Sequence, residues 1–86
     1  MQISVELALT PLQDDFEAPI KKFIKTLRSS GFTVIENPLG TQIYGEYDKI
    51  MDFLTEEVKE TFMSMDHVIM TMKLVKGNRS KYAADF

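Results

Sequence analysis

The side chains of this chain that could take part in catalysis or bind a metal are few. His67 is the sole histidine and cysteine is absent, so one chain cannot assemble a multi-histidine metal site, a hydrolase triad or a thiolate centre. The motifs Gly-x-Ser-x-Gly and His-Glu-x-x-His do not occur, and Gly40 stands alone in its turn, unlike the glycines of a phosphate-binding loop. We therefore expect no catalytic residues, no metal site and no cofactor.

Two pairs of adjacent carboxylates have structural explanations. Asp14 and Asp15 come just before a helical pattern, where side-chain oxygens cap free backbone amides. The Glu56–Glu57 pair lies beside the apolar stripe of a second helical pattern and indicates a solvated face. Acid–base chemistry by either pair is the less favoured interpretation.

The strands of the chain are marked by alternation of apolar and polar residues, which is typical of a sheet with one buried face. Alternation predicts strands at residues 3–10, 41–47 and 67–75. A β-branched and aromatic stretch predicts another strand at residues 32–36, followed by a turn at Asn37–Gly40. The second and third strands therefore form a hairpin.

Two segments between the strands have apolar residues at helical spacing. The first predicts a helix that begins between residues 15 and 18 and ends near Ser30, with Gly31 in the left-handed position that stops it. The second predicts a helix capped by Asp48 that runs to about Met65.

The order of the elements is β-α-β-β-α-β. Two right-handed β-α-β crossovers that share one sheet predict an α+β, ferredoxin-like sandwich. Its four-stranded antiparallel sheet has the order 4-1-3-2, with both helices on one face. We expect a single domain over residues 1–76 and a polar C-terminal tail over residues 77–86, with no firm structure after Val75.

Composition narrows the classes of partner. Lysine and arginine number 10 against 13 aspartates and glutamates, and the resulting net charge of −3 disfavours a sequence-independent nucleic-acid binder. The first residues lack the basic segment and continuous apolar stretch of a signal peptide, and no apolar run approaches the ~20 residues of a membrane span. We expect a cytoplasmic protein with neither nucleic acid nor membrane as a partner.

The sheet face turned away from the helices is the surface most relevant to function. By alternation it carries Glu6 on the first strand, Gln42 and Tyr44 on the third, and Thr71 on the fourth. A carboxylate, an amide and an aromatic ring together could hydrogen-bond an aminopyrimidine, neutralise a cation and stack on a ring. From this pattern alone, an ordinary solvated or dimer-contact face is the favoured interpretation, and ligand binding is the alternative.

Three functions known for this fold do not suit these residues. An RNA-recognition domain needs aromatic residues on both central strands, and the first strand has none. An acylphosphatase-like enzyme needs an arginine in the loop after that strand, where the sequence reads Thr-Pro-Leu-Gln-Asp-Asp. A metallochaperone needs paired cysteines. A small-molecule or oligomeric binding module remains.

Several short segments occur in a recognisable order: Leu9–Leu12, Gly31, Asn37–Thr41 and Gly45–Asp48. This order resembles the YkoF-like family of thiamine and hydroxymethylpyrimidine-binding proteins. Similar Pro-Leu, Pro-Met-Gly-Thr and Gly-Glu-Trp-Asp segments occur there at similar spacing. The resemblance covers roughly residues 1–76.

The resemblance implies a homo-oligomer that binds thiamine or its hydroxymethylpyrimidine moiety without catalysis and serves vitamin B1 uptake or carriage. The uncovered sheet face and the two unpaired edge strands predict a homodimer or a dimer of dimers. Thr41 stands at the Gly-Thr position of the family. We expect ligand contacts from the open sheet face and its adjoining loops, at Glu6, Asp14, Thr41, Gln42, Tyr44 and Thr71. The alternative is a structural or regulatory assembly module with a covered sheet face and no small-molecule ligand.

Overall fold

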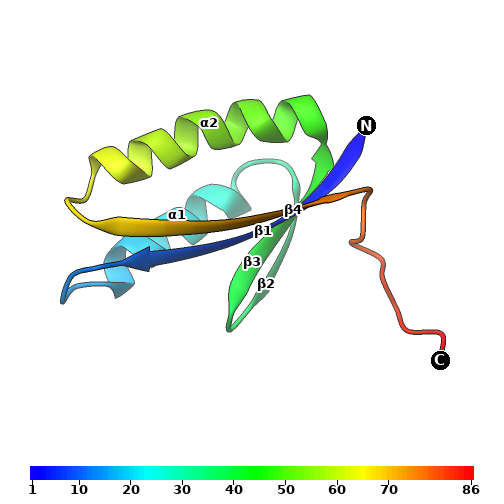
Figure 1. The fold of residues 1–86 in the computed structure, drawn as a ribbon, viewed down its shortest axis with the longest axis horizontal. Coiled ribbons are helices and arrows are strands. Elements are labelled where there is room, and N and C mark those ends of the chain that lie inside the picture. Colours follow the sequence, from blue (N-terminus) through cyan, green and yellow to red (C-terminus); the bar gives the residue numbers. More distant parts are fainter.

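The computed structural model describes residues 1–86 and contains four strands and two helices (Figure 1). In chain order they are β1 (Gln2–Pro11), α1 (Glu17–Arg28), β2 (Thr33–Asn37), β3 (Gly40–Glu46), α2 (Tyr47–Met63) and β4 (Val68–Lys76). The β-α-β-β-α-β order is confirmed, and every predicted element is present within about two residues of its expected ends.

The four strands form one antiparallel sheet in the order β2-β3-β1-β4. This is the predicted order 4-1-3-2 read from the opposite edge. Val5 lies opposite Ile43 on β3 and opposite Leu74 on β4, so these three residues share one face. Because side chains alternate along each strand, the register places Ser4 and Glu6 on the other face.

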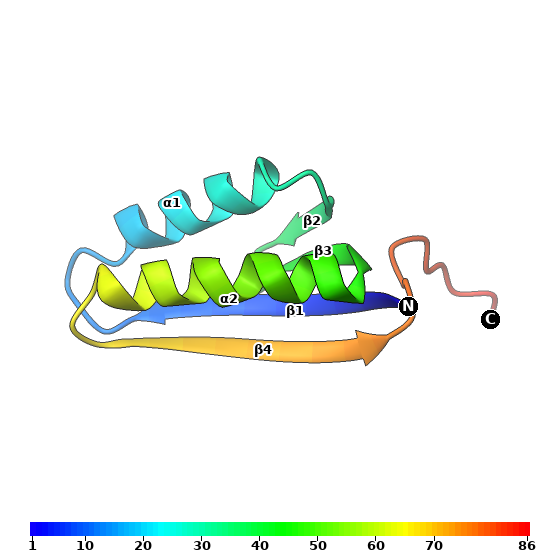
Figure 2. The ribbon, with the colours of Figure 1, turned by 90° about the horizontal axis from the view of Figure 1, so that it is seen from above.

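The core lies between one face of the sheet and the two helices, which run side by side when seen from above (Figure 2). Val5, Leu7 and Ile43 of the sheet are buried there. The buried residues that α1 and α2 add are Phe23, Leu27, Ile50 and Leu54. The ferredoxin-like sandwich with both helices on one face is therefore confirmed, and neither helix is long and apolar enough to cross a membrane.

The capping of both helices differs from the prediction. Phe16 is the N-cap of α1 and offers no side-chain hydrogen bond, so capping by Asp14 and Asp15 is wrong. The loop closes on itself instead, because the Phe16 N–H donates to the Asp14 carbonyl at 3.1 Å. The cap of α2 is Glu46, whose carboxylate accepts from the Lys49 N–H at 3.0 Å. Asp48 lies one residue inside the helix, where its charge still favours the N-terminal end of the helix dipole.

Gly45 lies where α2 and Phe32 pack close against the sheet. A Cβ atom there would lie 3.1 Å from the Phe32 ring and 3.4 Å from the Ile50 methyl group of α2. The absence of a side chain at this position therefore lets α2 pass close to the sheet. Phe32 itself packs edge-to-face on Phe53, with ring centroids 5.6 Å apart.

The C-terminal tail is more ordered at its start than predicted. Gly77 adopts a left-handed conformation (φ 100°) and turns the chain after β4. Its N–H donates to the Gln2 carbonyl at 2.8 Å, and its carbonyl accepts from the Ser4 hydroxyl at 2.7 Å. The same Ser4 oxygen accepts from the Arg79 N–H at 2.9 Å. The start of the tail is therefore held to β1, and the expectation of no firm structure after Val75 is wrong there. Alternation along the sequence cannot reveal such hydrogen bonds.

Candidate ligand pocket on the open sheet face

The open face of the sheet is built from rows of residues that lie opposite one another across β3, β1 and β4. One row contains Tyr44, Ser4 and Val75. The next row contains Gln42, Glu6 and Lys73. The three central residues that were predicted on this face, Glu6, Gln42 and Tyr44, are thus neighbours.

These two rows form the floor of a hollow of about 160 Å³, which we call the sheet pocket. In Figure 1 the C-terminal tail leaves the end of β4 and descends on the side of the sheet away from α2. One tail residue, Arg79, lines the hollow as well. The complete lining is Ser4, Val5, Glu6, Gln42, Tyr44, Lys73, Val75 and Arg79.

Glu6 and Gln42 form a polar pair within the sheet pocket. The Gln42 side-chain amide donates to one Glu6 carboxylate oxygen at 2.8 Å. This bond orients the amide and leaves its carbonyl and the second carboxylate oxygen as acceptors. An amino group on a ligand ring is a donor that suits both atoms.

Tyr44 supplies the aromatic surface of the sheet pocket. Although it lies on the face without helices, only 9% of the residue is exposed. Its neighbour in the row, Ser4, is 7% exposed and holds the tail through its hydroxyl. A ring packed to this degree keeps its orientation, so contact of a flat ligand with its exposed part costs little side-chain entropy.

Alternation also places Lys73 on the open face but indicates no role for it, and it does not indicate Arg79 at all. Both residues line the sheet pocket, and neither belongs to any of the three ion pairs of the protein. The only sequence signal for Arg79 was the nearby Gly77, because a glycine after a strand permits the turn that brings the tail back to β1.

Thr41 lies on the opposite side of the sheet from its neighbour Gln42. It is opposite Leu7 in the register, it is 5% exposed, and it takes part in none of the side-chain hydrogen bonds. It lines a second hollow of about 160 Å³, the hairpin pocket, between α1, the end of β1 and the β2–β3 turn. The hairpin pocket is mostly apolar, and its residues are Leu7, Ala8, Leu9, Ile20, Phe23, Ile24, Asn37, Pro38, Leu39, Gly40 and Thr41.

The two other predicted contact residues lie in neither pocket. Asp14 is exposed in the loop between β1 and α1. Thr71 is on the open face, opposite Ala8 and one row beyond Glu6 and Lys73, and its side chain is exposed. The fold therefore brings Glu6, Gln42 and Tyr44 together in the sheet pocket, and the other three predicted residues lie outside its lining.

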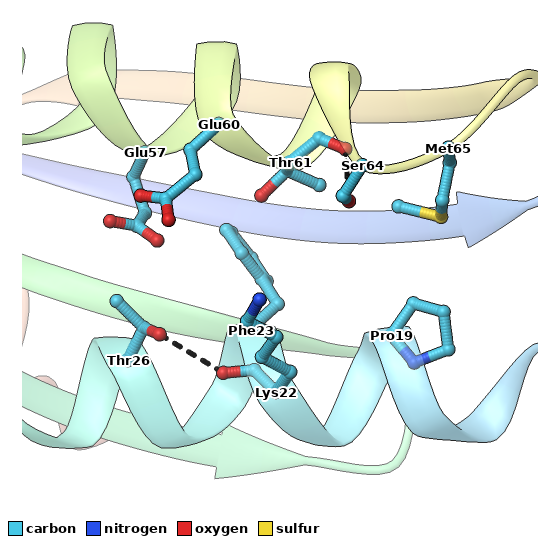
Figure 3. Close-up of a pocket in the computed structure, with 9 residues that line it drawn as sticks. All are labelled: Pro19, Lys22, Phe23, Thr26, Glu57, Glu60, Thr61, Ser64 and Met65. Carbon is cyan, nitrogen blue, oxygen red and sulfur yellow. Dashed lines mark hydrogen bonds between the residues drawn. The ribbon is translucent and has the colours of Figure 1, made fainter.

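A third gap, of about 30 Å³, lies between the two helices and is shown in Figure 3. Glu57 and Glu60 extend into it from α2, toward Lys22 and Thr26 of α1. Burial, together with the nearby Glu60 charge, raises the pKa of Glu57. The solvated interpretation of Glu56 holds, whereas Glu57 is half-buried. This gap has room for about one or two water molecules and none for an organic ligand.

Comparison with known proteins shows a family match over most of this chain. The model of the thiamine-binding protein family matches residues 5–82. A search of functionally characterised proteins finds no match.

Solved structures of similar proteins cover nearly the whole chain. A protein of Streptococcus pneumoniae is 29% identical, with a TM-score of 0.82 over 91% of this chain and 89% of that one. A candidate thiamine biosynthesis or salvage protein of Thermotoga maritima is 19% identical, with a TM-score of 0.81 over 90% and 85% of the two chains. A domain of unknown function from Bacillus cereus is 18% identical, with a TM-score of 0.74 over 99% and 85%.

The similarities to the Thermotoga maritima and Bacillus cereus proteins, at 19% and 18% identity, show a shared fold alone. The family match is a finding about the sequence itself, and it includes β1, the hairpin, β4 and the start of the tail. It confirms the resemblance indicated by the Asn37–Thr41 and Gly45–Asp48 segments. Because the match extends over residues 5–82, this chain belongs to the thiamine-binding protein family.

Proposed function

We propose that this protein binds thiamine or its hydroxymethylpyrimidine moiety without catalysing a reaction, and that the pyrimidine occupies the sheet pocket. The observation that carries the proposal is the meeting of Glu6, Gln42 and Tyr44 in one hollow of a chain from the thiamine-binding family. A carrier or buffer for vitamin B1 or its precursor in the cytoplasm is the role that this chemistry supports.

Each of the three residues has a separate part in binding. Tyr44 stacks on the pyrimidine ring. The free carboxylate oxygen of Glu6 and the carbonyl of Gln42 accept from the amino group of the ring. The negative charge of Glu6 also strengthens these hydrogen bonds.

The size of the sheet pocket supports binding of one ring. Its volume of about 160 Å³ is below the ~300–1,000 Å³ of pockets that enclose drug-sized ligands. The thiazolium half of thiamine therefore lies outside the pocket of a single chain. A second copy of the chain over the open face completes the enclosure.

Association of copies is part of the proposal, as a homodimer or a dimer of dimers. The sheet has two free edges, β2 and β4, and an unpaired edge is a template for pairing with another strand. The open face also exposes Ile35 on β2 and Ile69 on β4, at 39% and 50%. Contact between copies removes both features from water.

Isothermal titration calorimetry with thiamine and with hydroxymethylpyrimidine tests the proposal. We expect both to bind, and we expect Tyr44→Ala to weaken the affinity at least tenfold through loss of stacking. Thr41→Val, which changes the hairpin pocket alone, is the matched control and leaves the affinity unchanged. The reverse result would move the site to the hairpin pocket, and absence of heat with both compounds at millimolar concentration would refute ligand binding.

The exposed isoleucines of the open face also favour one other function. Ile35 and Ile69 flank the open face, so a second copy could seal it completely and leave no pocket. The protein would then be an assembly module without a small-molecule ligand. A crystal structure of the oligomer separates the two functions by the presence or absence of a hollow beside Tyr44.

A further inference from the structure

We propose that the preferred ligand of the sheet pocket is the phosphate ester of the hydroxymethylpyrimidine, with its phosphate held by Lys73 and Arg79. The inference rests on the proposed function and specifies its ligand class. Its starting observation is that two cationic side chains line the same hollow as the Glu6–Gln42 pair, and no carboxylate lies within ion-pair distance of either.

The charge of the pocket is opposite to that of the whole chain. The chain has a net charge of −3, whereas the pocket contains one carboxylate, Glu6, and two cations, Lys73 and Arg79. The sum of these three charges is +1. A neutral pyrimidine does not interact with this positive charge, and the thiazolium cation of thiamine is repelled by it. A phosphate group, in contrast, is attracted to it.

The tail holds Arg79 at the pocket through its backbone. The Arg79 N–H donates to the Ser4 hydroxyl at 2.9 Å, and that hydroxyl donates to the Gly77 carbonyl at 2.7 Å. Ser4 itself is 7% exposed, so the anchor is well protected from water. The guanidinium of Arg79 makes no side-chain hydrogen bond and keeps all its N–H donors for a phosphate, which it can bind with two parallel bonds.

The polar groups are ordered across the sheet in a way that suits a short ester. Tyr44 and Gln42 lie on β3, Glu6 on β1, and Lys73 on β4. Neighbouring strands are about 4.8 Å apart, so the ring-binding side and the cationic side are separated by about two strand spacings.

In the pyrimidine ester the phosphate is one carbon and one oxygen from the ring, within reach of the long Lys73 and Arg79 side chains. In thiamine phosphate the second ring intervenes. That phosphate would lie outside a pocket with room for one ring.

Calorimetric titration of five compounds tests the inference: hydroxymethylpyrimidine, its phosphate ester, thiamine, thiamine monophosphate and inorganic phosphate. We expect the ester to bind about ten- to a hundredfold more tightly than the free alcohol, as charge-assisted hydrogen bonds from two cations imply. The gain should shrink as salt is added, because both cations are exposed. Thiamine monophosphate should show no such gain over thiamine.

Two variants and a matched control locate the phosphate. Lys73→Gln and Arg79→Gln should each remove most of the gain from the phosphate and leave the affinity for the free alcohol within about twofold. Lys25→Gln removes the same charge from the exposed surface of α1, on the helical side of the sheet, and should change neither affinity. Circular dichroism confirms that all three variants are folded.

The outcomes separate this inference from the proposed function. Equal affinities for the alcohol and the ester would overturn the inference and leave the proposed function intact. Inorganic phosphate that binds as tightly as the ester would overturn the assignment of an ester, because the ring would then contribute nothing. Failure of both pyrimidines to bind would refute the inference, and failure of thiamine as well would refute the proposed function with it.

Discussion

The carboxylate of Glu6 on β1 and the amide of Gln42 on β3 lie directly opposite each other and share a hydrogen bond of 2.8 Å. The two residues are 36 positions apart in the sequence, and the antiparallel pairing of the central strands brings them together. The bond lies beside the packed ring of Tyr44 and between the two edges of the sheet. It makes the centre of the open face a preorganised acceptor for a flat, amino-bearing ring.

Glu6→Gln should weaken binding of the pyrimidine by one to two decades, because a hydrogen bond to a charged group contributes about 1.5–3 kcal/mol. Calorimetry with hydroxymethylpyrimidine measures the change. Glu56→Gln, on the exposed face of α2, is the control with the same loss of charge. Unchanged affinity in Glu6→Gln would show that the ligand binds elsewhere.

Ser4→Ala should release the start of the C-terminal tail. The Ser4 hydroxyl is the partner of both the Gly77 carbonyl and the Arg79 N–H, so its loss should lower the free energy of unfolding by about 1–2 kcal/mol. Urea denaturation measures the stability, and hydrogen exchange of the Arg79 amide should become faster. Ser64→Ala, which removes only a local bond at the end of α2, is the control. Unaltered exchange at Arg79 would contradict the anchoring role.

Gly45→Ala should destabilise the fold by about 1–3 kcal/mol, since the added methyl group meets the Phe32 ring at 3.1 Å in a packed layer. Phe32→Leu in the same chain should recover part of the loss by making room. A double-mutant cycle from denaturant midpoints measures this coupling. Simple addition of the two single effects would show that Phe32 is not the obstacle.

The ion pair between Arg28 and Glu36 should make stability depend on pH in the acid range. The Arg28 guanidinium donates to both Glu36 carboxylate oxygens, at 2.6 and 2.7 Å, and this contact lowers the pKa of Glu36. A lowered folded-state pKa contributes stability above the unfolded pKa, and this contribution is lost as the pH falls through the folded value.

Thermal unfolding of Glu36→Gln and of the wild type should therefore differ more at neutral pH than at pH values below the folded pKa of Glu36. Because both side chains are partly exposed, added salt should reduce the difference. A gap between the melting temperatures that stays constant with pH would rule out the ion pair as its source.

Sedimentation equilibrium at tens of micromolar protein should give a mass that is a multiple of the 9.9 kDa chain. The physical reason is the pair of free strand edges together with the exposed Ile35 and Ile69 on the uncovered face. Ile69→Lys should shift the mass toward the monomer, because a charge on that face opposes its burial. Leu39→Lys, in the exposed hairpin turn, is the control. A monomer mass for the wild type would contradict the proposed association.

The sequence by itself determined the element order, the strand order and the face on which each central strand residue lies. These properties follow from local periodicity. Val5 alternates with Glu6, and Ile43 alternates with Gln42, so only one orientation of each strand buries its apolar residues. Glu6, Gln42 and Tyr44 could be grouped for the same reason. The β-α-β connections then left one sheet topology to consider.

Only the tertiary structure decided which residues surround the pocket. Thr41, whose place in a motif suggested a contact beside Gln42, lines the hairpin pocket instead, because the fold brings α1, the end of β1 and the β2–β3 turn together around it. Asp14 does not cap α1, since the loop satisfies its own backbone. Arg79 reaches the pocket through hydrogen bonds to Ser4, a residue 75 positions away. Such long-range contacts leave no periodic trace in the sequence, which is why the place of Arg79 in the pocket lining became visible only in the folded chain.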